Sequence, residues 1–354
     1  IVTSTLNVDA AVDLSSTLAV AGNATFSSNI DVDGVTNLDV VDIDGAVDLA
    51  STLTVAGNVD FNGDLDVDGT ANLDIVDIDT SLTVDGTIKL DGNYPTASGN
   101  VALGLNALDA VSGNQNTAIG NSSAAATTSG TLNVSVGHQS LLVNTEGYQN
   151  TVVGANAMTA NTTGDAHVAM GYRALSSNTT ANNNTAIGYD SMRLNVTGSG
   201  NVAVGYNAME QNLGSNNTGV GSSALTANTT GASNVALGAS ALIANTTASN
   251  STAVGYQALT ANTTGATNTA FGKGALLANT TGNTNVAVGA NALAANVDGD
   301  KSVAVGVDAL AAQDPASNVD MYNVAVGDSA GKAVTTAIKN TLIGGLAGDA
   351  LNTG

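Results

Sequence analysis

One short phrase recurs fifteen times between residues 99 and 344, and every copy ends in a glycine. Most successive phrase glycines lie 17 residues apart. A period this regular predicts a solenoid, in which one unit is too small to hold a core and neighbouring units must stack. The phrase glycines are Gly104, Gly120, Gly137, Gly154, Gly171, Gly188, Gly205, Gly221, Gly238, Gly255, Gly272, Gly289, Gly306, Gly327 and Gly344.

Each unit arranges small and larger apolar residues around its phrase glycine. Residues 250–265, for example, predict a short strand, a glycine bend, a second strand and a polar turn. Because side chains alternate along a strand, we expect Val202 and Val204 to fill the coil interior and Ala203 to face a neighbouring chain. The glycine is expected at positive φ, where a Cβ has no room. The 21-residue spacing before Gly327 predicts a surface loop around residues 313–317.

Residues 1–92 carry a different repeat. Residues 11–26 return as 46–61 and residues 31–44 return as 66–79, in both cases 35 residues later. Leu and Val alternate there with Asp, Thr and Asn, which predicts half-buried strands whose apolar surface is too small for one chain to fold alone. We therefore expect an intertwined trimeric β stem over 1–92, a junction over 93–98 that contains Pro95, and the repeat array over 99–354.

The composition limits the classes of molecule that the chain can bind. Its 354 residues include three Phe, seven Tyr, no Trp and no Cys, and 29 acidic against 7 basic residues give a net charge of −22. Such a chain has little to attract phosphate groups or anionic membranes, so nucleic acid is not an expected partner. No apolar run is long enough to insert into a membrane. Without cysteine there are no disulfides and no thiolate metal sites.

The array also resembles a known family. Residues 201–208 and 285–292 are similar to the head repeats of trimeric autotransporter adhesins, and the resemblance extends over about residues 99–350. It implies a left-handed parallel β-roll, with three rolls side by side. Residues 51–61 and 82–86 resemble the shaft repeats of bacteriophage tail fibres, which also use adhesin-like head repeats. Together the resemblances imply an all-β, elongated homotrimeric fibre with a stem similar to a triple β-helix.

The expected function follows from this architecture. We expect a structural or adhesive fibre of a phage virion tail, whose partners are two further copies, other virion tail proteins and a host cell-surface glycan or protein receptor. One alternative is the head of a bacterial trimeric autotransporter adhesin on the cell surface. A less favoured alternative is a depolymerase tailspike, in which clefts between chains bring together carboxylates such as Glu146 and Glu210. No enzymatic activity and no cofactor are expected.

The residue that follows the phrase glycine is the most variable position of the repeat, which predicts an exposed column. Tyr172, Tyr189 and Tyr206 occupy it in consecutive units and should form a ladder with a spacing of about 4.8 Å. Such rings could stack on sugars, or they could pack together and stiffen the solenoid, which is the favoured interpretation. The candidate surface-binding residues are Tyr172, Tyr189, Tyr206 and Tyr256, and the same column holds His138, Lys273 and Asp328.

Other polar patterns are interpreted as structural. The two histidines, His138 and His167, fall in different columns and match no catalytic triad or metal-ligand spacing. No metal is expected at the aspartates between residues 42 and 79, because intervening Val and Ile indicate solvated strand faces; these are Asp42, Asp44, Asp48, Asp77 and Asp79. A glycosylation sequon recurs at one turn of the repeat, where Asn and Thr favour turn formation; the asparagines are Asn161, Asn178, Asn228, Asn245, Asn262 and Asn279.

Overall fold

The computed structural model describes residues 98–353, together with a few short pieces between residues 17 and 59. The chain divides into two units, Ile1–Leu82 and Thr83–Gly354. Apart from those pieces and Ser98, the expected stem over 1–92 and the junction over 93–98 lie outside the described residues, as do the five aspartates considered above. Residues 98–353 form the solenoid.

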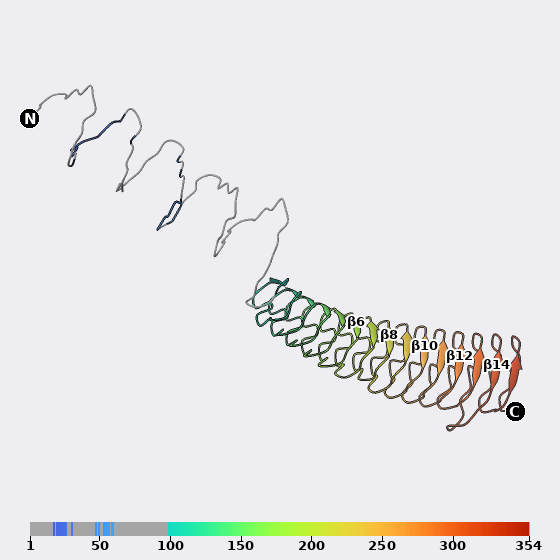
Figure 1. The fold of residues 1–354 in the computed structure, drawn as a ribbon. Coiled ribbons are helices and arrows are strands. Elements are labelled where there is room, and N and C mark those ends of the chain that lie inside the picture. The colour runs from blue at the N-terminus through green and yellow to red at the C-terminus, as the bar shows by residue number, and fades with distance from the viewer. Residues whose placement is uncertain are drawn as a thin grey trace, which may run out of the picture. The chain divides into compact units, whose positions relative to one another are not determined.

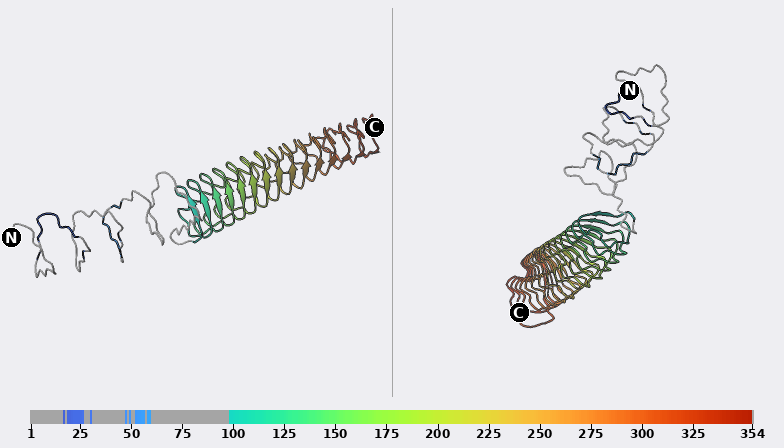
Figure 2. Two further views of the ribbon diagram at one scale, coloured as in Figure 1. Left: turned by 90° about the horizontal axis from the view of Figure 1, so that it is seen from above. Right: turned by 90° about the vertical axis from the view of Figure 1, so that its left-hand side faces the viewer.

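Fifteen strands of three residues each form one parallel sheet, in which the spatial order equals the order along the chain. Figure 1 shows the stacked coils, and the turned views in Figure 2 show the strand arrows in a single row along one side of the stack. The described residues contain no helix. The strands are Val101–Leu103 (β1), Thr117–Ile119 (β2), Val134–Val136 (β3), Thr151–Val153 (β4), Val168–Met170 (β5), Thr185–Ile187 (β6), Val202–Val204 (β7), Thr218–Val220 (β8), Val235–Leu237 (β9), Thr252–Val254 (β10), Thr269–Phe271 (β11), Val286–Val288 (β12), Val303–Val305 (β13), Val324–Val326 (β14) and Thr341–Ile343 (β15).

The register places the same phrase position of each coil beside that of the next. Val202 pairs with Thr218 across a 16-residue spacing, and Val303 pairs with Val324 across the 21-residue spacing. Backbone hydrogen bonds run to both neighbours, as when the N–H of Gly205 donates to the carbonyl of Ile187 at 2.8 Å. Every strand between β1 and β15 is thus satisfied on both edges, and the predicted parallel β-solenoid is confirmed.

The middle residue of each strand points into the coil, so the expected orientation of the strand side chains is wrong. Ala203 is fully buried, whereas Val202 is 37% exposed. The coil interior is narrow: a Cβ added to Gly219, which takes the Ala position in β8, would lie 2.7 Å from Cγ of Met209. The middle residue is Ala, Ser or Gly in thirteen of the fifteen strands, with Val152 in β4 and Leu342 in β15 as the exceptions, and the first and third residues of each strand face outward.

The segment after the phrase glycine is a turn, not the second strand that the alternating pattern predicts. Two of its residues adopt positive φ, for example Asn207 at 52° and Met209 at 53°. A bulky residue rarely adopts this conformation, and the cost is about 1–3 kcal/mol. Burial offsets it, because the Leu or Met at this position is fully buried in twelve coils: Leu108, Leu141, Met158, Leu175, Met192, Met209, Leu225, Leu242, Leu259, Leu276, Leu293 and Leu310.

The phrase glycines adopt positive φ in all fifteen copies, as expected. Gly221, at a φ of 133°, shows why no side chain fits: an added Cβ would lie 2.6 Å from the carbonyl carbon and oxygen of Gly238 in the next coil. The bends therefore stack glycine on glycine along the solenoid.

Two rows of buried asparagines join the coils. The strand-start row consists of the residues just before each strand, such as Asn133, and the turn row consists of the sequon asparagines and their equivalents, such as Asn144. The side-chain amides of Asn133 and Asn144 both donate to the carbonyl of Gly147, at 2.8 and 3.0 Å. Asn161 donates in turn to Oδ1 of Asn144 at 2.8 Å. The six sequon asparagines are all fully buried, which confirms their structural interpretation.

The extra residues between β13 and β14 form a surface loop that projects past the neighbouring turns (Figure 1). Gln313 still occupies the turn row, where its Nε2 donates to Oδ1 of Asn296 at 3.0 Å. Residues 316–320 are exposed, and Met321 is buried again. The predicted loop is therefore confirmed, although it runs on to residue 320, beyond the expected 313–317, and Gln313 and Pro315 within it are buried.

Candidate functional site

The rings of Tyr172, Tyr189 and Tyr206 stack in three consecutive coils, after β5, β6 and β7; we call these residues the tyrosine ladder. Ring centroids lie 5.3 Å apart in the first pair and 5.4 Å apart in the second, with interplanar angles of 28° and 18°. The side chains are 41%, 44% and 55% exposed, respectively. The expected exposed ladder is confirmed, and a role in binding stays a prediction.

Tyr256, the fourth candidate residue, is not part of this stack. It lies three coils beyond Tyr206 and is 51% exposed. Between them the column holds Ser222 and Ala239, which are too small to reach either ring. At about 4.8 Å per coil, Tyr206 and Tyr256 are separated by about 14 Å along the stack.

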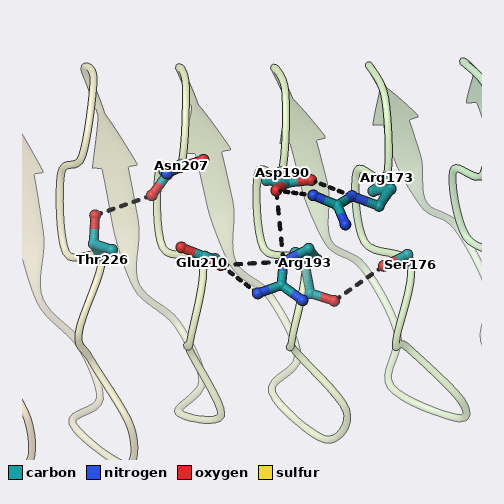
Figure 3. A network of polar contacts seen from close by, with 7 residues as sticks. All are labelled: Arg173, Ser176, Asp190, Arg193, Asn207, Glu210 and Thr226. Atoms are coloured by element: carbon teal, nitrogen blue, oxygen red, sulfur yellow. Dashed lines mark hydrogen bonds and ion pairs between the residues drawn. The ribbon is translucent and has the colours of Figure 1, made fainter.

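A network of ion pairs lies beside the ladder, over the same three coils (Figure 3). Arg173 donates two hydrogen bonds to the carboxylate of Asp190, from Nε at 2.8 Å and from Nη2 at 2.6 Å. Arg193 lies 3.6 Å from the same carboxylate and also pairs with Glu210 in the next coil. Asp190 is almost completely buried by these contacts. A buried carboxylate with two cationic partners is strongly oriented.

The network also touches the ladder. The guanidinium carbon of Arg173 lies 5.0 Å from the ring centre of Tyr172 and 5.9 Å from that of Tyr189, within the range of cation–π attraction. Its hydrogen bonds to Asp190, reinforced by the charge of that carboxylate, raise the pKa of Arg173 further above its usual range. Two arginines and two carboxylates leave the cluster with no net charge, in a chain whose net charge is −22.

Sequence reasoning singled out the tyrosines but not the ion network. Arg173 and Asp190 are 17 residues apart, and so are Arg193 and Glu210. Opposite charges one repeat apart are therefore the sequence signal that could have revealed the ion pairs, since the register places such residues side by side in neighbouring coils. The two carboxylates considered for a depolymerase are not brought together within the chain, because Glu146 precedes β4 and Glu210 follows β7.

The two histidines lie in separate places. His138 is exposed in the column that follows the phrase glycine, whereas His167 is buried in the strand-start row. His167 replaces an asparagine of that row: its Nδ1 accepts the backbone N–H of Asn184 at 3.1 Å, and its Nε2 lies 2.6 Å from the carbonyl of Ala181. Burial lowers the pKa of His167. Its two nearest partners are backbone groups and the third is the side-chain amide of Asn178 at 3.3 Å, which indicates a structural residue.

Residues 98–353 offer no enclosed site. Their surface has no pocket, and they contain no group of His, Asp and Glu residues arranged to hold a metal ion. No helix in the described part of the chain is long and apolar enough to cross a membrane. Comparisons with protein-family models and with curated proteins find no match. What the solenoid presents is therefore a pair of extended surfaces, the outer face of the sheet and the column that carries the tyrosines.

Proposed function

We propose that the chain is the subunit of a homotrimeric fibre of a phage tail, which holds or forms the surface that attaches to a host cell. The observation that carries this proposal is the outer apolar row, which we define as the third residue of each strand. This residue is Val, Ile, Leu, Met or Phe in all fifteen strands and is charged in none. Leu237 and Phe271 of the row are 48% and 55% exposed. An apolar surface of this length calls for a covering partner.

A second and third copy of the chain suit the outer apolar row. The row repeats once per coil, and a surface that covers it along its full length must repeat with the same rise. An identical solenoid meets this condition coil by coil. Repeated burial of Val, Ile and Leu would contribute about 25 cal/mol for every Å² removed from water.

The left-handed roll, the trimeric stoichiometry and the phage origin rest on the resemblance of the repeats to adhesin heads and tail-fibre shafts. In a fibre the function is geometric. Stacked coils supply stiffness and reach, and several fibres on one particle turn weak surface contacts into firm attachment through effective concentration. Other tail proteins and a host-surface glycan or protein are the partners that this role requires.

The molar mass of the purified chain in solution, measured by light scattering, tests the proposal. We expect a mass near three times 34.5 kDa. Leu237→Asp should lower the mass toward that of one chain, because three carboxylates would then meet in an apolar interface. The matched control is Ser222→Asp, which places the same charge in a column that already holds Asp328, and it should remain a trimer. A monomeric wild-type chain would contradict the proposal.

A further inference from the structure

The open end of the tyrosine ladder is a surface with the properties of a ligand-binding platform. Tyr189 has a ring stacked on each side, at 5.3 and 5.4 Å, whereas Tyr206 has one on the Tyr189 side only. The next positions of the column are Ser222 and Ala239, so no described aromatic ring covers the opposite face of Tyr206. Exposure is accordingly highest at Tyr206, at 55%. One aromatic face is thus held rigidly and left free.

The chemistry around this face favours an uncharged, hydroxyl-rich ligand. The neighbouring ion network cancels its own charge, through the pairs Arg173–Asp190 and Arg193–Glu210. Both arginines of the chain are occupied there, and a net charge of −22 repels anionic ligands. Beside the tyrosine column, the second position after the glycine holds Asn207, Ser223, Ser240 and Gln257, whose side chains donate and accept hydrogen bonds.

The spacing of the rings adds a preference for an extended ligand. Tyr256 carries a second exposed ring about 14 Å farther along the stack, with only Ser222 and Ala239 between it and Tyr206. A polysaccharide chain that lies along the solenoid would place one sugar unit above Ser222, against the free face of Tyr206, and continue over Ala239 to the exposed ring of Tyr256.

We infer that Tyr206 and Tyr256, with the small residues between them, form a binding site for an extended neutral polysaccharide. One sugar unit would place a C–H face on the free face of Tyr206, since an aromatic side chain offers an apolar face and a polar hydroxyl. The inference deepens the attachment role proposed above and rests on it for its biological meaning. The tyrosine ladder behind Tyr206 would then act as a rigid support for the platform.

Electrophoresis of the native 354-residue chain through gels that contain a soluble polysaccharide tests the inference. The probes are hydroxyethylcellulose, dextran and galactomannan, which are neutral, and alginate, which is anionic. We expect at least one neutral probe to retard the protein. Tyr206→Ser should weaken that retardation about tenfold, as judged from its dependence on polysaccharide concentration.

The controls separate binding from folding and from assembly. Serine already occupies this column at Ser222, so Tyr206→Ser should keep the solenoid intact. Tyr148→Ser removes a tyrosine outside the column that is 47% exposed, and this variant should be retarded like the wild type. Retardation by alginate alone, equal retardation of the Tyr206 variant, or none by any neutral probe would each overturn the inference. A trimer that no glycan retards would contradict the binding site alone, whereas a monomer would contradict the fibre.

Discussion

Nδ1 of His167 accepts the backbone N–H of Asn184 at 3.1 Å, a contact that an asparagine Oδ1 makes in most other coils. Since Nδ1 accepts, the proton of the neutral ring must be on Nε2, which lies 2.6 Å from the carbonyl of Ala181. The imidazole therefore reproduces both hydrogen bonds of an asparagine amide. It can do so only while it is neutral, because protonation would place an N–H against the N–H of Asn184.

Replacement of His167 by asparagine should remove a pH-dependent part of the stability. Burial lowers the pKa of His167 from 6.5, with Asp165 as the charged group that opposes the shift. The unfolded chain thus binds a proton at a pH where the folded chain does not. The stability that neutral His167 contributes is complete above about pH 6.5. It is lost as the pH falls through the lowered pKa, by up to about 1.4 kcal/mol per pH unit for each chain.

The measurement is the denaturation midpoint at a series of pH values between 4 and 8, on the order of one unit apart. His167→Asn should flatten the acid limb of this profile. His138→Asn, which alters the exposed histidine, should leave the profile as in the wild type. An unchanged slope in the His167 variant would show that this ring does not stay neutral in the folded chain.

Addition of a methyl group at a phrase glycine should have very different effects inside the stack and at its last coil. Gly221 and Gly344 both adopt positive φ, at 133° and 121°, but a Cβ at Gly344 would meet nothing within 4 Å. Gly344→Ala therefore tests the backbone strain alone, which costs about 1–3 kcal/mol. Gly221→Ala adds a collision with the backbone of Gly238 and should cost at least about 4 kcal/mol.

Chemical denaturation of the two glycine variants, compared with the wild type, checks this difference. Similar losses in both variants would mean that the close stacking of the bends does not limit the side chain. In that case the conformation of the glycine alone would explain why the repeat retains it.

Removal of one asparagine from the turn row should destabilise the coils on both sides of it. Asn245 donates to Oδ1 of Asn228 at 2.7 Å and accepts from Nδ2 of Asn262 at 2.9 Å. Asn245→Ala leaves the buried Oδ1 of Asn228 without its donor, and we expect a loss of about 2–3 kcal/mol. Thr247→Ala, in the exposed part of the same turn, should change the free energy of unfolding by less than about 0.5 kcal/mol.

Thermal or chemical unfolding, followed by circular dichroism, measures the free energy of unfolding of the Asn245→Ala and Thr247→Ala variants. The interpretation of the turn row as a stabilising element would be wrong if the Asn245 and Thr247 variants were equally stable. The same buried position makes the sequon at Asn245 inaccessible to a modifying enzyme in the folded chain.

Sequence periodicity predicted how the coils stack but not which side chains fill the interior of each coil. The 17-residue period gave the parallel register, the bend at Gly205 and the exposed position of Tyr206. It did not decide which face of the strand lies inside. Alternation separates Val202 from Ala203, but both are apolar, so the pattern does not say which of the two is buried. The width of the interior makes that choice, and it depends on Met209 from the opposite wall.

The turn after the glycine was mispredicted for a related reason. Alternation of small and large residues around Met209 is typical of a strand, and bulky residues seldom adopt positive φ. Complete burial in the stack outweighs that preference, which is a tertiary effect that a local pattern does not contain. The ion network at Arg173 and Asp190 was accessible in principle, since the register converts a spacing of 17 residues into direct contact.

The loop between β13 and β14 shows that the register depends on the strands and not on the number of residues between them. Val303 and Val324 pair as the other coils do, although four more residues than usual separate them, and residues 316–320 project into solvent. A foreign peptide grafted at this loop would be displayed at a fixed height along the solenoid while the coils on either side kept their pairing. The fold therefore offers a natural insertion point for engineering.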